Sequence, residues 1–358
     1  MMAPRPLSRR AKVLLPVGLL LLVALSIHRF FIAEPPASAV EIRGGTMGTT
    51  YTVRLDVPSL DGEARDRASS AVAAVLDEVN RLMSTYDSTS ELSRFNRNPG
   101  TEPAALSAPT LEVLQAALEV ARRSGGALDV TLAPLIDTWG FGASDAPPAA
   151  PDSATMARLL RGVGYEKLVL DPEAGTVTRT HPDVTLDFSS VAKGYATERV
   201  ADTLAALGYE RVLVEVGGEL RAGAPKADGS PWRVALEEPD ASGRVLHRVI
   251  EVVDEGVATS GDYRNVLELD GVLHTHLLDP RTGRPARHRG ASVSVVHPSA
   301  TMADAWATAL AVLGVDEGLL VADREGLAAL FITRDDDRFV ARASEAFRER
   351  FGASDPEG

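Results

Sequence analysis

Residues able to bind phosphate and metal gather in one stretch, residues 184–208. Asp187 ends an apolar run that we expect to form a short strand closing at Phe188, and Lys193 falls in the first turn of the helix predicted to follow. Because the helix dipole disfavours a cation at this end, an anionic group is expected to face Lys193. Backbone N–H groups at a helix start beside a lysine suit a phosphate, and a nearby carboxylate suits a metal ion or a nucleobase edge. The alternative is a structural ion pair between Asp187 and Lys193.

A second pair of oxygen-bearing side chains lies in residues 299–314, an alanine-rich run predicted to be a helix that ends at Gly314. Asp304 and Thr308 are four residues apart, so they share one helix face and can place a carboxylate and a hydroxyl on one hard cation. Thr301 and Asp304 also fit a capping box at the helix start. Spacing alone favours the cap.

Helices and short strands that could position these groups alternate along the chain. Helical periodicity predicts further helices over 61–83, 109–124 and 155–162. Strand-like runs flank a glycine-rich turn at 44–48, where a plain hairpin is favoured over a ligand-binding loop. The remaining strands are predicted at 171–175, as a hairpin, and at 209–223, 232–239, 248–261, 261–285, 327–333 and 338–341. The prediction is therefore an α+β fold with mixed, largely antiparallel sheets.

Three connections carry candidate or unusual residues. Residues 83–97 read as a polar loop with one aromatic, Tyr86, which can stack on a flat ring or belong to the core. Residues 127–132 begin a strand or turn that contains Asp129. Residues 143–152 are rich in proline and alanine and predict a mobile excursion.

Composition excludes several classes of function. Hydrophobic residues make up 45% and charged residues 24% of the 358 residues, which predicts a packed globular body. The net charge of -13 argues against a nucleic-acid partner, because a phosphate backbone requires a surplus of Lys and Arg. The chain has no cysteine, which excludes disulfides, thiolate metal sites and a lipid-bearing N-terminal cysteine.

The first 39 residues predict export. A basic start precedes an apolar run over 13–27, which suits a signal-peptide core and is short for a membrane span of about twenty residues. The small-x-small triplet at 37–39 lies further from this run than a cleavage site usually does. We therefore expect residues 1–39 to be an uncleaved membrane anchor and linker, with the basic end cytoplasmic and the body, residues 40–350, outside.

A set of sequence blocks identifies a family. In chain order they are MGTTYTV, MSTYDSTSELSRFN, GALDVTLAPL with TWGFG, LDFSSVAKGYA, ATSGDYRN, HLLDPRTGRP and ADAWATALAVLG. Residues 44–314 thereby resemble the ApbE family of FAD:protein FMN transferases. The resemblance implies a Mg²⁺-dependent enzyme of the bacterial inner membrane and periplasm, with a two-lobed α+β fold related to the T-fold. It also implies that FAD binds between the lobes and that FMN is attached to a Thr or Ser of an exported or membrane flavoprotein, such as a Na⁺-pumping NADH:quinone oxidoreductase subunit.

The resemblance assigns roles to individual residues. It implies an FAD site lined by Met47, Tyr86, Ala127, Leu128, Asp129, Asp187, Lys193 and Leu278. It implies Mg²⁺ ligands at Ser190, Asp304 and Thr308. It also implies that His276 is the catalytic histidine, which suits a base of near-neutral pKa that takes the acceptor hydroxyl's proton. The alternatives for His276 are a strand-end histidine bonded to backbone and a zinc site shared with His274, for which no third nitrogen or sulfur ligand is evident.

The chain departs from the family pattern at two places. Glu219 stands where the family often has Asn or Asp, and an N-terminal helix replaces the usual lipoprotein anchor. Two other functions compete with flavin transfer: a Mg²⁺-dependent FAD pyrophosphatase, and a membrane-anchored flavin-binding or heme-handling protein without catalysis. The pairing of Asp304 with Thr308 argues against the second, because flavin binding alone requires no metal.

Overall fold

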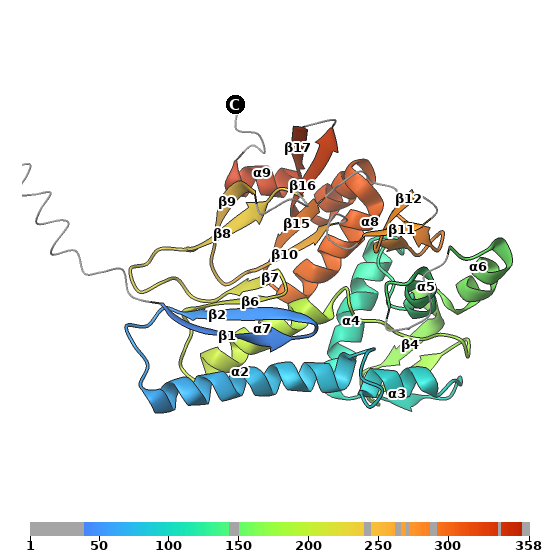
Figure 1. The fold of residues 1–358 in the computed structure, drawn as a ribbon, viewed down its shortest axis with the longest axis horizontal. Helices are drawn as coiled ribbons and strands as arrows, with labels where there is room; N and C mark the ends of the chain where they lie inside the picture. The colour runs from blue at the N-terminus through green and yellow to red at the C-terminus, as the bar shows by residue number, and fades with distance from the viewer. Residues whose placement is uncertain are drawn as a thin grey trace, which may run out of the picture.

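An eight-stranded antiparallel sheet forms the centre of the molecule (Figure 1). The structure is a computed structural model that describes residues 39–142, 150–239, 245–261, 266–269, 272–286, 292–335 and 338–352. The strand order is β1–β2–β6–β7–β10–β15–β16–β17. The strands are β1 (Val40–Thr46), β2 (Thr49–Leu55), β6 (Val212–Val216), β7 (Glu219–Ala222), β10 (Gly256–Gly261), β15 (Ser292–His297), β16 (Ala328–Asp335) and β17 (Arg338–Ala343).

Helices α7 (Ala192–Ala206) and α8 (Ala300–Glu325) cover one face of this sheet, and α2 (Gly62–Met83) runs along the outer side of α7 (Figure 1). The helix α4 (Ala108–Arg123) packs against α8. The main core lies between these layers and includes Val214 and Trp306, both fully buried. Burial of each such side chain contributes about 1.5–3 kcal/mol, so the sheet and the helices that carry Lys193 and Asp304 form one packed unit.

A separate hairpin packs on the opposite face of the sheet. It consists of β8 (Trp232–Glu237) and β9 (Leu246–Val252), and it shares a second core with the C-terminal helix α9 (Glu345–Phe351). Trp232 and Phe347 are the large side chains of this core. The sheet is therefore covered on both faces, by helices on one and by a hairpin and a short helix on the other.

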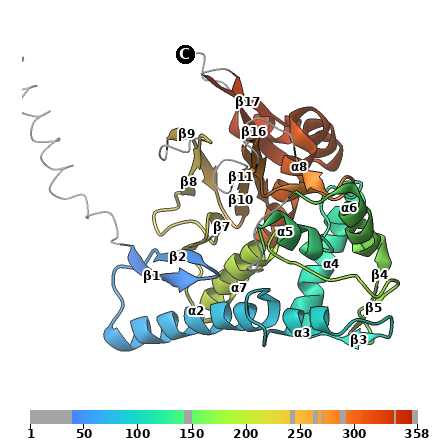
Figure 2. The same cartoon turned by 45° about the vertical axis from the view of Figure 1, so that its right-hand side comes forward.

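The remaining elements lie beside α4, on the opposite side of the molecule from β8 and β9 (Figure 2). A third apolar cluster, which includes Trp139, is formed by residues between Leu132 and Val163 together with Leu269 and Leu278. These elements are α3 (Glu91–Arg97), β3 (Ala104–Ala105), α5 (Ala133–Trp139), α6 (Ser153–Leu159), η1 (Leu160–Gly162), η2 (Tyr165–Lys167), β4 (Leu168–Asp171), β5 (Thr176–Arg179), β11 (Val266–Leu269), β12 (Val272–Thr275), β13 (Leu278–Asp279) and β14 (Arg284–Pro285).

The predicted α+β class with largely antiparallel sheets is confirmed. A mixed sheet was expected, whereas the strand pairings among the described residues are all antiparallel. The hairpin about residues 44–48 and the helix predicted over 61–83 are present. The predicted boundary of the body at residues 40–350 stays a prediction. The anchor predicted within residues 1–39 and most of the excursion at 143–152 lie outside the described residues.

The strand predicted to close at Phe188 is wrong. Residues 184–188 form an irregular segment, because the side chain of Asn96 takes the hydrogen bonds that a neighbouring strand would take. Its Oδ1 accepts from the Leu186 N–H at 2.8 Å, and its Nδ2 donates to the Leu186 carbonyl at 2.7 Å. The Asp187 N–H donates to the Val130 carbonyl at 2.8 Å. These bonds fix the entry into α7 without a sheet.

Two helices were not predicted from the sequence, and the end of a third was placed too early. The polar loop at 83–97 contains α3, and the segment after 127–132 contains α5. The helix predicted to end at Gly314 leaves helical geometry there, with φ 75° and ψ -177°, but resumes at once and continues to Glu325. Of the helices in the described residues, α8 alone has the length and hydropathy of a membrane span, and its contacts with the sheet identify it as a core helix.

Candidate active site

Every residue predicted for the site lines one cavity of about 1320 Å³. Its lining comes from segments far apart in the chain: the β1–β2 turn, the loops after α2 and α4, the start of α7, the segment after β12, and α8. The predicted residues that line it are Met47, Tyr86, Ala127, Leu128, Asp129, Asp187, Ser190, Lys193, His276, Leu278, Asp304 and Thr308. Their individual contacts with a ligand remain predictions.

The anionic group that faces Lys193 is a carboxylate of the chain, Glu219 at the start of β7. Its Oε1 accepts a hydrogen bond from the Lys193 ammonium in an ion pair. The alternative of an Asp187–Lys193 ion pair is therefore wrong; Asp187 instead accepts from the Ser189 N–H at 2.7 Å, which closes the turn before α7. Burial alone would lower the pKa of Lys193, but the carboxylates of Glu219 and Asp304 outweigh it and raise that pKa.

Glu219 is a site residue that the sequence indicated only as a departure from the family pattern. Glu219 is 3% exposed, and its second carboxyl oxygen, Oε2, has no hydrogen-bond partner. Burial raises the pKa of this carboxyl to about 8, with Lys193 acting against the shift and Asp304 adding to it. Two carboxyl groups, of Glu219 and Asp304, and one ammonium group therefore meet at the buried end of the cavity.

The capping-box alternative for Asp304 is wrong. Asp304 is buried, and its Oδ2 accepts a hydrogen bond from the Gly194 N–H of α7 at 2.8 Å. Ser299 caps α8 instead, with its Oγ accepting from the Met302 N–H at 3.3 Å. The Thr301 hydroxyl donates to Glu198 at 2.6 Å. Asp304 therefore points across to α7 and into the cavity, beside Lys193.

A close helix contact explains how Asp304 reaches the start of α7. A Cβ added at Gly194 would lie 2.4 Å from the Ala300 carbonyl oxygen and 2.6 Å from Asp304 Cβ. Only glycine allows this approach of the two helices. Burial raises the pKa of Asp304, while the attraction of Lys193 acts in the opposite direction.

The donor atoms at this end fit a hard divalent cation. The orphaned Glu219 Oε2, the Asp304 carboxylate and the hydroxyls of Thr308 and Ser190 line the same cavity, and all are oxygen donors. Within the described ranges no group of three or more acidic or histidine side chains is spaced to hold a metal unaided. A cation here would thus complete its shell with water and substrate phosphates, which is how proteins commonly bind Mg²⁺.

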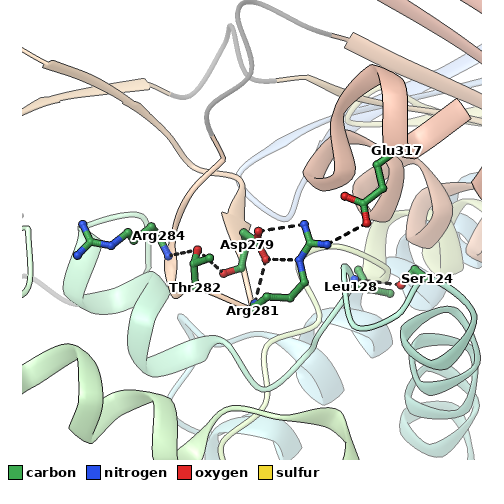
Figure 3. Close-up of polar contacts among 7 residues, drawn as sticks. All are labelled: Ser124, Leu128, Asp279, Arg281, Thr282, Arg284 and Glu317. Atoms are coloured by element: carbon green, nitrogen blue, oxygen red, sulfur yellow. Dashed lines mark hydrogen bonds and ion pairs between the residues drawn. The ribbon is translucent and has the colours of Figure 1, made fainter. Parts of the chain in front are cut away.

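His276 follows β12 and lies beside Phe141, with ring centroids 6.3 Å apart and the rings nearly edge to face. The zinc alternative gains no support, because the His274 ring lies against Trp139, with ring centroids 5.3 Å apart and a tilt of 40°, and the described residues hold no suitable metal cluster. The turn after His276 is fixed from two sides. Arg281 pairs with Asp279 at 2.9 Å and with Glu317 of α8 at 3.0 Å (Figure 3).

The opposite end of the cavity is less polar. Met47 and Gly48 form the β1–β2 turn with φ 49° and 70°, the left-handed pair of a type I′ hairpin, so this glycine-rich segment is both a hairpin turn and a cavity wall. Tyr86 is 75% exposed at the rim, which excludes an ordinary core residue. The Asp129 carboxylate accepts from the N–H groups of Thr131 and Tyr165, both at 2.8 Å, and thereby holds its own loop in place.

Comparison with known proteins agrees with this geometry. The model of the ApbE family matches residues 47–331. The chain is 40% identical over 316 residues to the FAD:protein FMN transferase of Vibrio cholerae, covering 88% of this chain and 93% of that protein. It is 34% identical over 309 residues to the Escherichia coli K12 protein of the same name, covering 86% and 88% of the two chains.

Solved structures give the same result. The flavin transferase ApbE from Vibrio cholerae superposes with a TM-score of 0.79 at 38% identity, over 88% of this chain and 100% of that one. The apo flavinyl transferase ApbE of Pseudomonas stutzeri gives 0.80 at 39% identity, over 88% and 98% of the two chains. With this similarity along most of its length, and with the predicted site residues around one cavity, the chain belongs to the ApbE family.

Proposed function

We propose that this enzyme transfers FMN from FAD to a Thr or Ser hydroxyl of an acceptor protein and releases AMP. The observation that carries the proposal is the meeting of Lys193, Glu219, Asp304 and His276 around one cavity in a chain of this family. Lysine at a helix start suits a phosphate, buried oxygen donors suit a cation, and histidine suits a proton acceptor. A flavin-binding protein without catalysis would not require the buried carboxyl groups of Glu219 and Asp304.

The chemistry follows from these groups. The acceptor oxygen forms a bond to the phosphorus of the FMN half of FAD, and the bridging P–O bond breaks so that AMP departs with the electron pair. Lys193 holds the pyrophosphate and balances its charge, since displacement at phosphorus depends mostly on positioning and electrostatics. His276 takes the proton of the acceptor hydroxyl and returns it to solvent.

Mg²⁺ would be held by Asp304 and Thr308 with Ser190, and it would supply further neutralisation of the two phosphates. Glu219 pairs with Lys193 in the same pocket, so it sets the net charge that a cation meets. The acidic end thus supports a dependence on a divalent cation.

The partner and the place follow from the family and from residues 1–39. We infer that the acceptor is an exported or membrane redox protein, such as a subunit of a Na⁺-pumping NADH:quinone oxidoreductase, and that the N-terminal segment holds the enzyme at the bacterial inner membrane with its body in the periplasm. The basic start followed by an apolar run supports this placement.

Intact-mass spectrometry of a candidate acceptor, after incubation with enzyme, FAD and Mg²⁺, tests the proposal. We expect the acceptor to gain the mass of one FMN phosphoester, and the Thr→Val acceptor variant to gain none. His276→Ala should slow labelling about 10²- to 10⁴-fold, the usual effect of losing a general base, with FAD affinity nearly unchanged. An unlabelled acceptor, or a His276→Ala variant as fast as wild type, contradicts the proposal or the assigned base respectively.

A further inference from the structure

The cavity has a second part that the residues predicted to hold FAD and Mg²⁺ do not use. Its total volume, about 1320 Å³, exceeds the roughly 300–1000 Å³ of typical small-molecule pockets. On β2 and β6, Thr52 faces Glu215 and Arg54 faces Leu213 in register, and all four line the cavity. Leu213 belongs to the second core, so these side chains lie on the face opposite α7 and α8. We call this part the outer groove.

The β6–β7 turn joins the outer groove to the acidic end. Gly217 and Gly218 both line the cavity and lie between Glu215, on the groove side, and Glu219, on the helix side. A Cβ at Gly217 would lie 3.2 Å from Lys193 Cδ, so the turn touches the lysine directly. The turn is held by the Gly218 N–H, which donates to Glu215 at 2.7 Å. A group lying in the outer groove therefore reaches Lys193 by crossing one glycine turn.

The wall of the outer groove is the edge of a strand. Five consecutive residues of β8, residues 233–237, line the cavity. Their side chains alternate, with Val234 and Leu236 buried in the second core and Arg233 and Ala235 exposed. Consecutive residues of a strand share a backbone edge and no common side-chain face, so the cavity runs along that edge. Among the described strands β8 pairs with β9 alone.

We propose that the outer groove binds the acceptor polypeptide as an extended strand along residues 233–236 of β8, on the edge to which no described strand is paired, and that this brings its Thr or Ser across the Gly217–Gly218 turn to the FAD pyrophosphate. An edge strand presents unpaired N–H and C=O groups, and an extended peptide satisfies them by strand addition. The groove is continuous with the cavity where the reaction occurs, and its walls carry both signs of charge, from Arg54, Arg233 and Glu215. This inference rests on the proposed transfer of FMN to a protein.

A bulky side chain in the groove tests the location. Ala235→Trp obstructs the exposed side of β8, and we expect it to raise the KM for the acceptor about tenfold or more while FAD affinity stays at the wild-type value. Ala174→Trp is the matched control, an exposed alanine in the β4–β5 turn outside the cavity lining, and should keep the wild-type KM. Wild-type acceptor KM in Ala235→Trp would overturn the assignment of the groove.

N-methylated peptides test the binding mode. The probe is a fluorescent peptide around the modified residue of the Na⁺-pumping NADH:quinone oxidoreductase subunit, with Val in place of the acceptor Thr and one backbone nitrogen methylated in each version. Strand addition predicts that binding weakens at alternate positions, since every second N–H of a strand points to the same neighbour. Equal effects at successive positions would overturn strand addition. Equal effects together with labelling of the intact subunit by wild-type enzyme would contradict strand addition alone and leave the transferase function unaffected. If wild-type enzyme labels no acceptor, both the transferase function and the binding site for the acceptor are contradicted.

Discussion

Asp304 combines a structural contact with a proposed role at the cation. Its Oδ2 accepts from the Gly194 N–H, and the carboxylate lies in the cavity beside Lys193 and Glu219. Substitution by alanine therefore mixes two effects, because it also leaves a buried N–H unsatisfied at a cost of about 1–3 kcal/mol. Asn keeps an oxygen for the Gly194 N–H and removes only the charge.

Asp304→Asn should therefore separate the roles. We expect turnover with saturating Mg²⁺ to fall by on the order of 10²-fold or more, because charge stabilisation by a bound metal is worth several kcal/mol. Its melting temperature should stay close to wild type, whereas that of Asp304→Ala should fall. Rates from AMP release and thermal unfolding of both variants provide the measurement. Wild-type turnover in Asp304→Asn would remove this carboxylate from the proposed cation site.

Glu219 predicts a pH dependence of stability. Burial raises its pKa from the ordinary 4.5 to about 8, so the folded protein binds this proton more tightly than the unfolded chain does. Its contribution to stability is therefore complete below about pH 4.5 and is lost as the pH rises to about 8, with a slope of up to about 1.4 kcal/mol per pH unit. Glu219→Gln cannot titrate.

Denaturant unfolding of the metal-free protein between pH 4.5 and 8 measures this effect. The difference in unfolding free energy between wild type and Glu219→Gln should change steadily across the window. Glu251→Gln, at an exposed position of β9, should follow the wild-type curve. Parallel curves for wild type and Glu219→Gln would show that Glu219 does not titrate in this range.

The contact between α7 and α8 sets the geometry of the acidic end. Gly194 allows α7 to touch Ala300 and Asp304, and Gly256 of β10 meets Ala300 in the same way, since a Cβ there would lie 2.3 Å from Ala300 Cα. The absence of a side chain at both glycines allows the start of α8 to lie in direct contact with α7 and β10. The relative position of Lys193 and Asp304 therefore depends on two residues without side chains.

Gly194→Ala should force these helices apart. Overpacking of this kind typically costs about 1–3 kcal/mol, and we expect the apparent affinity for Mg²⁺ to weaken together with stability. Gly62→Ala at the start of α2 is the control, because a Cβ there meets nothing within 4 Å. It should leave stability unchanged or raise it by about 0.4–1 kcal/mol. Equal unfolding free energies for the two variants would contradict the close contact.

The sequence predicted helices and strands better than the segments that join them. Helical periodicity predicted α2, α4 and α7 to within a residue or two, because each has one apolar face. It failed at residues 184–188, where Asn96 replaces a neighbouring strand, and at Gly314, where a helix resumes after a break. Such outcomes depend on partners distant in sequence, which local patterns do not contain.

The same limit applies to the site. The position of Lys193 in a first helical turn predicted a facing anion, but the partner, Glu219, comes from a strand 26 residues later. Likewise the spacing of Thr301 and Asp304 predicted a cap, while the contact with Gly194 spans 110 residues. The family blocks named the lining residues, and only the fold shows that Glu219 joins them.

At the scale of the whole molecule, the basic start and the apolar run within residues 1–39 predict a separable membrane anchor. Full-length protein should sediment with membranes after cell fractionation, and a chain that starts at Val40 should be soluble yet retain activity with FAD and acceptor. Western blotting of the fractions, with protease added to intact spheroplasts, measures both location and orientation. If cells that express the full-length chain yield soluble periplasmic protein with Val40 as its first residue, the anchor is contradicted and cleavage is indicated.

In the proposed reaction the enzyme transfers FMN to a protein hydroxyl and not to water. Simultaneous measurement of AMP release and of covalent flavin on the acceptor, by chromatography and by in-gel fluorescence, tests it directly. We predict one flavin on the acceptor for each AMP released, and AMP release that rises with acceptor concentration and nearly stops when the acceptor Thr is changed to Val. AMP released at the full rate without acceptor, accompanied by free FMN, would contradict the claim and identify the enzyme as an FAD pyrophosphatase.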